Sequence, residues 1–198
     1  TQKAQVIHVK RLNAVVRWLQ RDARQLAYRR FNGKQTELLL VSDAAFKKEA
    51  DEGHALKGGL YLRVDLDGFK YPTKLHNLEI SSDKPKRMVC HIIDYACKQQ
   101  RHVTRSTFAA ELFAACDAMD HGLLLAIMLH QVLTGSVTVS TARELREFGG
   151  WKVRMVLAVD AYSVFAAATA HQIKIPAEKS LVSHVQFLRE LLDRGVLH

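Results

Sequence analysis

Apolar residues recur every three or four positions in several stretches of the chain, which is the spacing of an amphipathic helix. They predict helices over about residues 3–22, 104–133, 141–149, 162–170 and 176–195. Thr104 or Ser106 is expected to cap the second of these helices. The capping box Thr141–Glu144 is expected to begin the third, and Pro176 the last, which would end at Gly195.

Runs of apolar and β-branched residues between turn signals are typical of strands. They predict strands over residues 25–30, 37–42, 55–64, 88–96 and 153–159, and the start of another at 196–198. Asn32-Gly33 favours a hairpin between the first two strands, and Gly58-Gly59 allows a bulge or a close approach in the third. Residues 65–87 are polar and contain two prolines, so they are expected to form a long excursion between strands.

This order of elements predicts an α/β domain. Three strands in succession favour antiparallel pairing, and the strand that follows the long helix would join them in a mixed central sheet flanked by helices. The chain has 198 residues, which is enough to bury one substantial core. We expect residues 35–198 to form this domain and residues 1–34 to be a basic helical extension.

Three acidic residues stand where the apolar pattern ends or is interrupted. Asp43 and Asp160 each close a predicted strand, and Glu111 lies within the small-residue face of the long helix. Taken singly, an Asp after a strand is usually a turn or cap residue, and a Glu on a helix is usually solvated. Brought together by the sheet and one crossing helix, the three carboxylates would form a strong site for a hard divalent cation.

The net charge of +9 and the pI near 9.6 favour a polyanionic partner. Residues 1–34 carry nine Lys or Arg residues against Asp22 alone. A solvated helix face or a surface for an acidic neighbour would also account for this excess. With an acid-rich site downstream, the backbone of a nucleic acid is the better interpretation.

The cysteines and the hydropathy of the chain indicate the cellular compartment of the protein. Cys90, Cys97 and Cys116 lie in apolar stretches and predict reduced core thiols rather than a disulfide framework. A zinc site that adds His91 and His102 to the first two is disfavoured, because no CxxC pair is present. No apolar run approaches the ~20 residues that span a bilayer, and the opening residues are not a secretory signal. An intracellular protein without membrane contact is expected.

Short motifs follow one another in a fixed order along almost the whole chain. They are Val41-Ser42-Asp43-Ala44, Lys98-Gln99-Gln100, residues 106–112, Val159-Asp160-Ala161, Lys179-Ser180-Leu181 and Phe187-Leu188-Arg189-Glu190. No single motif is specific, but the ordered set resembles the ribonuclease H domain of copia-type LTR retrotransposon polyproteins. Ala110-Glu111-Leu112 is also similar to a motif of retroviral ribonucleases H.

The resemblance implies a ribonuclease H-like fold and an endonuclease that hydrolyses the RNA strand of RNA–DNA hybrids during reverse transcription. It implies two Mg²⁺ ions, which Mn²⁺ can replace, at the catalytic residues Asp43, Glu111 and Asp160. Asp43 would bridge both ions, Glu111 would bind the leaving-group ion and Asp160 would complete the site. The candidates for contacts to the nucleic-acid backbone and sugars are Lys98, Gln99, Arg101 and Arg105.

The resemblance also implies a reverse transcriptase domain of the same polyprotein as a partner, and residues 1–34 resemble the segment that connects the two. Location in a cytoplasmic retroelement particle or in the nucleus is expected, and the oligomeric state is left open.

The family has a fourth acid on a helix after a final strand, and we expect this chain to lack both elements. An inactive or degenerate module that binds nucleic acid without cleaving it is therefore the alternative. Integrases and Holliday-junction resolvases, which share the fold with different acid spacing, are the remaining enzymatic rivals. The motifs GxSxG, GxxxxGK[ST] and HExxH are absent from the sequence.

Overall fold

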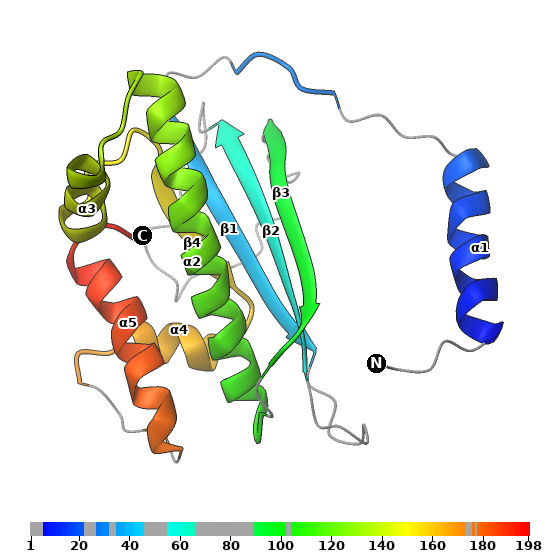
Figure 1. Ribbon diagram of the computed structural model, residues 1–198. Coiled ribbons are helices and arrows are strands. Elements are labelled where there is room, and N and C mark those ends of the chain that lie inside the picture. The colour runs from blue at the N-terminus through cyan, green and yellow to red at the C-terminus, as the bar shows by residue number, and fades with distance from the viewer. Residues whose placement is uncertain are drawn as a thin grey trace, which may run out of the picture. The chain divides into compact units, whose positions relative to one another are not determined.

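The structure of the chain is a computed structural model (Figure 1), which describes residues 6–21, 27–31, 35–45, 55–65, 89–101, 104–172, 176 and 178–198. The chain divides into two compact units, Thr1–Arg30 and Phe31–His198. The Asn32-Gly33 turn, His102 and nearly all of the predicted excursion over residues 65–87 lie outside the described residues.

The first unit contains helix α1, Val6–Arg21, within the range that the apolar spacing predicts. Its apolar stripe is exposed, with exposed fractions between 42% and 62% for Val9, Leu12, Val16 and Leu19. Basic residues occupy the rest of the helix surface, so α1 is amphipathic as expected.

The second unit is built on a four-stranded sheet in the order β3-β2-β1-β4. The strands are β1 (Thr36–Ala45), β2 (Leu56–Asp65), β3 (Cys90–Gln99) and β4 (Arg154–Val159). The pairs β1–β2 and β2–β3 are antiparallel, and β1–β4 is parallel. The prediction of an α/β domain with a mixed sheet and three antiparallel first strands is confirmed.

The strand predicted over residues 25–30 is wrong for the part that the structure describes, because residues 27–30 are not in a strand. The predicted hairpin partner was the strand over residues 37–42, which became β1. Both edges of β1 are taken, one by β2 and the other by β4. No edge of β1 therefore remains for an additional strand.

The central strand β1 is apolar because it is covered on one face and paired on both edges. Leu38 and Leu40 are fully buried and belong to the main core cluster. Glu37 is also buried, and Arg154, its register partner on β4, places Nε 3.0 Å from a carboxylate oxygen of Glu37. This ion pair neutralises a buried charge at the beginning of β1.

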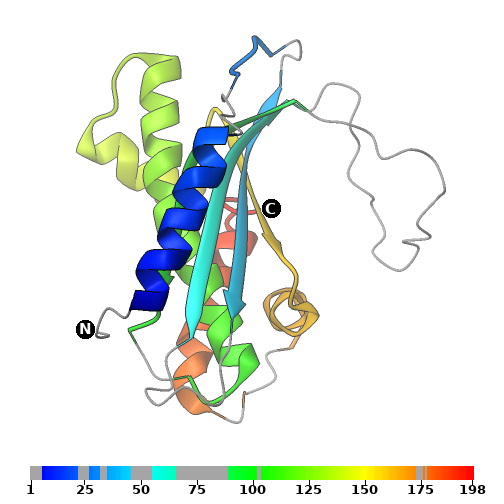
Figure 2. The same ribbon diagram turned by 90° about the vertical axis from the view of Figure 1, so that its right-hand side faces the viewer.

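Helix α2, Thr107–Thr134, runs along one face of the sheet and packs mainly on β1 (Figures 1 and 2). Its cap is Ser106, whose Oγ accepts the backbone N–H of Ala109 at 3.1 Å. Gly135 ends it with a φ of 99°, a value that glycine adopts without strain. Of the two caps that the sequence allowed, Thr104 is instead buried before the helix.

The remaining elements are short helices that follow α2 and β4 in the chain. They are α3 (Val139–Phe148), α4 (Tyr162–Thr169), a 3₁₀ turn (Lys179–Leu181) and α5 (Val182–Asp193). Helix α5 packs against α2 and α4. Beyond it, Leu197 forms a parallel bridge with Met155 of β4, which agrees with the predicted start of another strand.

Two helix starts differ from the prediction. The cap of α3 is Thr138, whose Oγ1 accepts the backbone N–H of Thr141 at 3.1 Å, so Thr141 lies inside the helix that it was expected to begin. The last α-helix begins at Val182 and not at Pro176, because a separate 3₁₀ turn precedes it. For α3 two capping-type residues lie close together, and local sequence alone does not rank them. Helix α5 instead follows Leu181, whose side chain makes no capping hydrogen bond.

The strand β3 also differs from the expectation. It extends through Gln99, so Lys98 and Gln99 are strand residues and not a lead-in to α2. Since β3 is the edge of the sheet, Cys90 and Cys97 are exposed free thiols, and only Cys116 is a core thiol. The bulge is in β3 and not at the glycines of β2: Tyr61 pairs with Asp94 and Leu62 with Ile92, which leaves Ile93 as the extra residue.

The expectation that no apolar run approaches the length of a bilayer span is wrong, because helix α2 is long and apolar enough to cross a membrane by length and composition alone. This is weak evidence, since the core helix of a globular domain passes the same test. The apolar side chains of α2 include much of the core, and 56% of its most apolar window is buried in the protein. The burial accounts for the composition of α2 without a bilayer.

The contact between Gly122 of α2 and Leu40 of β1 gives a testable prediction. A Cβ at position 122 would overlap the Leu40 side chain, which is fully buried. Gly122→Ala should therefore lower the free energy of unfolding by ~1–3 kcal/mol, although alanine normally stabilises a helix by ~1 kcal/mol relative to glycine. In the Leu40→Ala background the same substitution should be neutral or stabilising. Urea denaturation of the four proteins measures this coupling, and an unchanged effect in both backgrounds would contradict it.

Candidate functional site

The parallel pairing of β1 with β4 brings Asp43 and Asp160 together. Ser42 and Val159 are register partners, so the next residue on each chain stands at the same end of the two strands. Asp43 lies near the C-terminal end of β1, and Asp160 is the first residue after β4. Both carboxylates are exposed at this end of the sheet.

Helix α2 contributes the third carboxylate through a patch of small residues. Ala44 and Ala55 of the sheet pack against Ala110 and Ala114 of α2 in a separate buried cluster. Methyl groups allow the helix to approach the sheet closely at this point. Glu111, which lies within this stretch of α2, is consequently held against the ends of β1 and β4.

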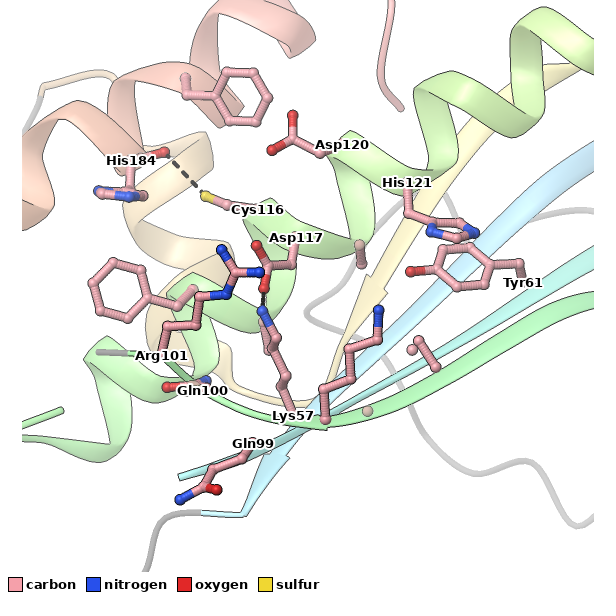
Figure 3. A pocket seen from close by; sticks show the side chains of 18 of the residues that line it. Lys57, Tyr61, Gln99, Gln100, Arg101, Cys116, Asp117, Asp120, His121 and His184 are labelled. Carbon is pink, nitrogen blue, oxygen red and sulfur yellow. Dashed lines mark hydrogen bonds and ion pairs between the residues drawn. The ribbon is translucent and has the colours of Figure 1, made fainter. Parts of the chain in front are cut away.

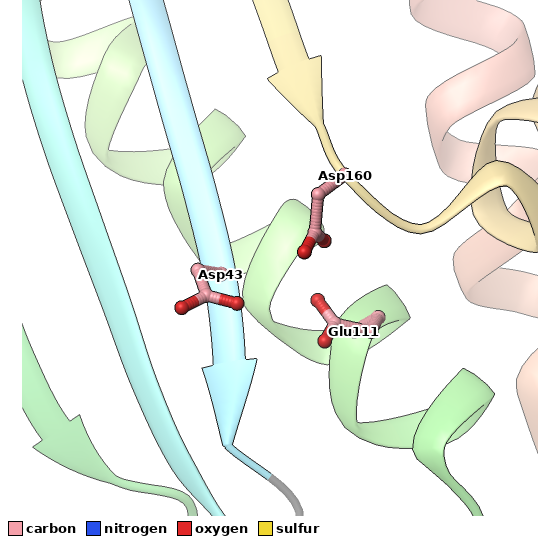
Figure 4. A group of neighbouring side chains, drawn as sticks. All are labelled: Asp43, Glu111 and Asp160. Carbon is pink, nitrogen blue, oxygen red and sulfur yellow. The ribbon is translucent and has the colours of Figure 1, made fainter.

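The three acids that the sequence singles out form one group in the structure (Figure 4). Ligand oxygens of Asp43, Glu111 and Asp160 all lie within 4.8 Å of one another. Figure 4 shows the Asp160 and Glu111 carboxylates pointing toward each other, with Asp43 beside them on β1. Glu111 is only 6% exposed, whereas the two aspartates are exposed.

The electrostatics of the group are unfavourable in the absence of a cation. Burial, and then the charges of Asp160 and Asp43, raise the pKa of Glu111 from 4.5 to about 7. A hydrogen bond from the backbone N–H of Ala44 opposes this shift but does not cancel it. A positive charge nearby would therefore stabilise the ionised form of Glu111.

The donor set fits a hard divalent cation. Three carboxylates supply only oxygen ligands, and Mg²⁺, Mn²⁺ and Ca²⁺ prefer oxygen. The exposure of Asp43 and Asp160 leaves one side of the group open to solvent and to a substrate. Among the described residues, no other group of His, Cys, Asp or Glu side chains is close enough together to hold a metal ion.

The four residues proposed for nucleic-acid contacts divide between two pockets. Lys98, Gln99 and Arg101 line a pocket of about 780 Å³ between the β2–β3 face, α2 and α5 (Figure 3). Arg105 lines a second, of about 770 Å³, formed by the start of α2 and by α4. The side chains of Lys98, Arg101 and Arg105 are exposed. The four residues therefore line two pockets, and none of the three clustered acids lines either one.

Several polar residues of the larger pocket were not singled out from the sequence. Lys57 of β2 is the register partner of Lys98 and forms an ion pair with Asp117 of α2. His121 lies 2.7 Å from the carboxylate of Asp94 and stacks on Tyr61. These neighbours depend on the register of β2 with β3 and on the packing of α2 against the sheet. Residues 66–89 separate the two strands, and a connection of that length hides their register.

The comparisons with known proteins add no relative: no protein-family model, no curated protein and no solved structure matches the chain. The site is therefore interpreted from its own geometry and from the motifs in the sequence.

The raised pKa of Glu111 predicts how stability depends on pH without a metal. A carboxyl group whose folded pKa lies above its unfolded value binds more protons in the folded state, so unfolding becomes easier as pH rises from about 4.5 to about 7. The loss should reach at most ~3 kcal/mol. Glu111→Gln should flatten the profile, while Glu147→Gln, on the exposed face of α3, should keep it. Thermal melts in EDTA between pH 4 and pH 8 measure the difference, and equal slopes for both variants would contradict it.

Proposed function

We propose that this protein is a metal-dependent endonuclease with a ribonuclease H-like fold that hydrolyses the RNA strand of RNA–DNA hybrids. The observation that carries the proposal is the meeting of Asp43, Glu111 and Asp160 within 4.8 Å. Such a group is suited to hold two divalent ions, Mg²⁺ or Mn²⁺, which when bound activate water and stabilise the leaving oxygen of a phosphodiester.

The arrangement of elements supports the fold assignment. Three antiparallel strands precede α2, and a strand parallel to β1 follows it, with one acid each on β1, α2 and the end of β4. The motif order that resembles copia-type ribonuclease H domains follows the same elements. The three carboxylates can meet because β1 and β4 end on the same side of the sheet and α2 crosses it there.

The chain's own residues have separable tasks in this proposal. Asp43 and Asp160 would hold the ions on the open side, where the scissile phosphate enters. Glu111 would complete the ligand set from the buried side, with its carboxylate oriented by the N–H of Ala44. Arg105, which directly precedes the cap of α2 and is exposed, is available for a backbone phosphate.

The charge of the chain supports a nucleic-acid substrate. The net charge is +9, and α1 carries basic residues without an acidic one among the residues Val6–Arg21. We extend the proposal to the partners that the motif resemblance implies, a hybrid and a reverse transcriptase domain of the same polyprotein. The location would be a cytoplasmic retroelement particle or the nucleus.

A second function, binding of nucleic acid without cleavage, is favoured by one observation. Among the described residues the acidic group has three members, and no fourth carboxylate joins it. With fewer ligands, two ions would be held less firmly. A chain of this kind would still bind a hybrid through its positive charge.

The two functions differ in cleavage, because only the nuclease has an activity for Asp43→Asn to remove. For the nuclease, cleavage of a labelled RNA–DNA hybrid in Mg²⁺ should fall at least ~100-fold, since even the outer-shell partners of metal ligands cost 10–100-fold. Hybrid binding in EDTA should be unchanged or tighter, because a negative charge near the phosphates is removed. Gel analysis of the cleaved RNA strand and fluorescence anisotropy measure the two quantities.

Asp193→Asn is the matched control, because it removes an exposed aspartate at the end of α5, away from the acidic group. It should cleave like the wild type in both Mg²⁺ and Mn²⁺. If wild-type protein binds the hybrid but cuts it with neither ion, the nuclease proposal fails and the binding function stands. Cleavage that survives Asp43→Asn would point to a contaminating nuclease.

A further inference from the structure

The larger pocket lies beside the acidic group but is a separate site. It is lined by Lys57, Lys98 and Arg101 at the sheet end and by residues of α2 and α5 at the other, and its volume is about 780 Å³. None of the three clustered acids lines it. Figure 3 shows Lys57, Arg101 and Asp117 gathered over the middle of α2.

Three cations are close together in this pocket. The pKa of Lys57 is lowered, first by burial and then by the charges of Lys98 and Arg101. Asp117 pairs with Lys57 and neutralises that charge. Among the described residues neither Lys98 nor Arg101 forms a direct ion pair, and the charge of Lys98 contributes to lowering the pKa of Asp94 on the same strand. Both cations can therefore reach an external anion.

With both acids that line it counted, Asp117 and Asp120, the three cations leave the pocket with an excess of one positive charge. Asp120 also lines the pocket and is exposed. Asp94, which lies on β3 near the pocket wall, is bonded to His121 at 2.7 Å. Asp117 and Asp120 therefore stand on α2 and Asp94 in the middle of β3, while Lys98 stands near the end of β3 and Arg101 just after it.

The backbone that carries Lys98 and Arg101 is fixed by the residue between them. Gln100 is 3% exposed, its N–H donates to the carbonyl of Ala55 and its Nε2 donates to the carbonyl of Ala110, both at 2.7 Å. The remaining amide oxygen, Oε1, is buried at the pocket wall and has no hydrogen-bond partner. A buried acceptor without a donor is unfavourable, so a donor entering the pocket would be stabilised.

The pocket also offers an aromatic surface. Phe113 of α2 and Phe187 of α5 line it and are half-buried, and Phe113 meets His184 edge-on with ring centroids 4.8 Å apart. An aromatic ring accepts a nucleobase by stacking, whatever its sequence. A volume of about 780 Å³ exceeds what one phosphate ion needs and is within the range of small-molecule sites.

We propose that this pocket binds a nucleotide, with its phosphate on Lys98 and Arg101 and its base against Phe187. The phosphate suits the two unpaired cations, because its several oxygens can accept hydrogen bonds from an ammonium and a guanidinium at once. The nucleotide is either a free one or a unit of a nucleic-acid strand. The proposal does not depend on the nuclease function, since binding here requires no metal and none of the three acids.

Calorimetric titration in EDTA with adenosine 5′-monophosphate and with inorganic phosphate tests the proposal. Lys98→Ala/Arg101→Ala should weaken binding of the nucleotide at least ~10-fold, since two charge-assisted contacts are lost. Arg143→Ala/Arg146→Ala is the matched control, because it removes two exposed cations of α3 outside the pocket, and it should bind like the wild type. Phe187→Leu should weaken binding of the nucleotide but not of inorganic phosphate.

Competition with a labelled RNA–DNA hybrid identifies the source of the nucleotide. Displacement of the mononucleotide by the hybrid would assign the pocket to a strand, and the absence of displacement would assign it to a free nucleotide. No saturable binding of the mononucleotide, or equal affinity in the pocket variant and the control, would overturn the proposal. Because cleavage depends on Asp43 and this titration does not, failure of the pocket and failure of the nuclease are distinguishable.

Discussion

The close packing of α2 on β1 is the constraint on which both the core and the acidic group depend. Along the middle of the helix, Gly122 leaves room for the side chain of Leu40. Near its start, Ala110 and Ala114 pack on Ala44 and Ala55. Small residues at both places keep the helix near the sheet along its length, so Glu111 reaches the ends of the strands. A larger side chain at either place would separate the helix from the acids on β1 and β4.

The same packing also makes the ionised form of Glu111 unfavourable. Burial of Glu111 beside Asp43 and Asp160 raises its pKa to about 7, so an ionised group is unfavourable there near neutral pH. A fold selected for stability alone would place an apolar residue at this position. Functional sites commonly retain such unfavourable charges, which is the physical reason for interpreting this group as a cation site. In the neighbouring pocket, the hydrogen bonds of Gln100 fix the backbone that carries Lys98 and Arg101.

Much of the fold could be predicted because its signals are local. Periodicity placed α2, α4 and β4 within a few residues, and the Leu-rich run before Asp43 predicted a strand over residues 37–42, which lies within β1. The errors fall where two local signals compete. Thr138 and Thr141 are both acceptable caps, and only the packing of α3 selects the first. Residues 27–30 had strand character, but both edges of β1 were already occupied.

The order of elements, the excess of positive charge and the three acids at the interruptions of the apolar pattern could all be recognised without the structure. These follow from side-chain chemistry and spacing along the chain. Only the tertiary structure decided that the acids meet within 4.8 Å, that Cys90 and Cys97 are exposed on an edge strand, and that Lys57 joins Lys98 and Arg101. Each depends on strand register and on the approach of α2 to the sheet, and these are set by contacts between residues far apart in the sequence.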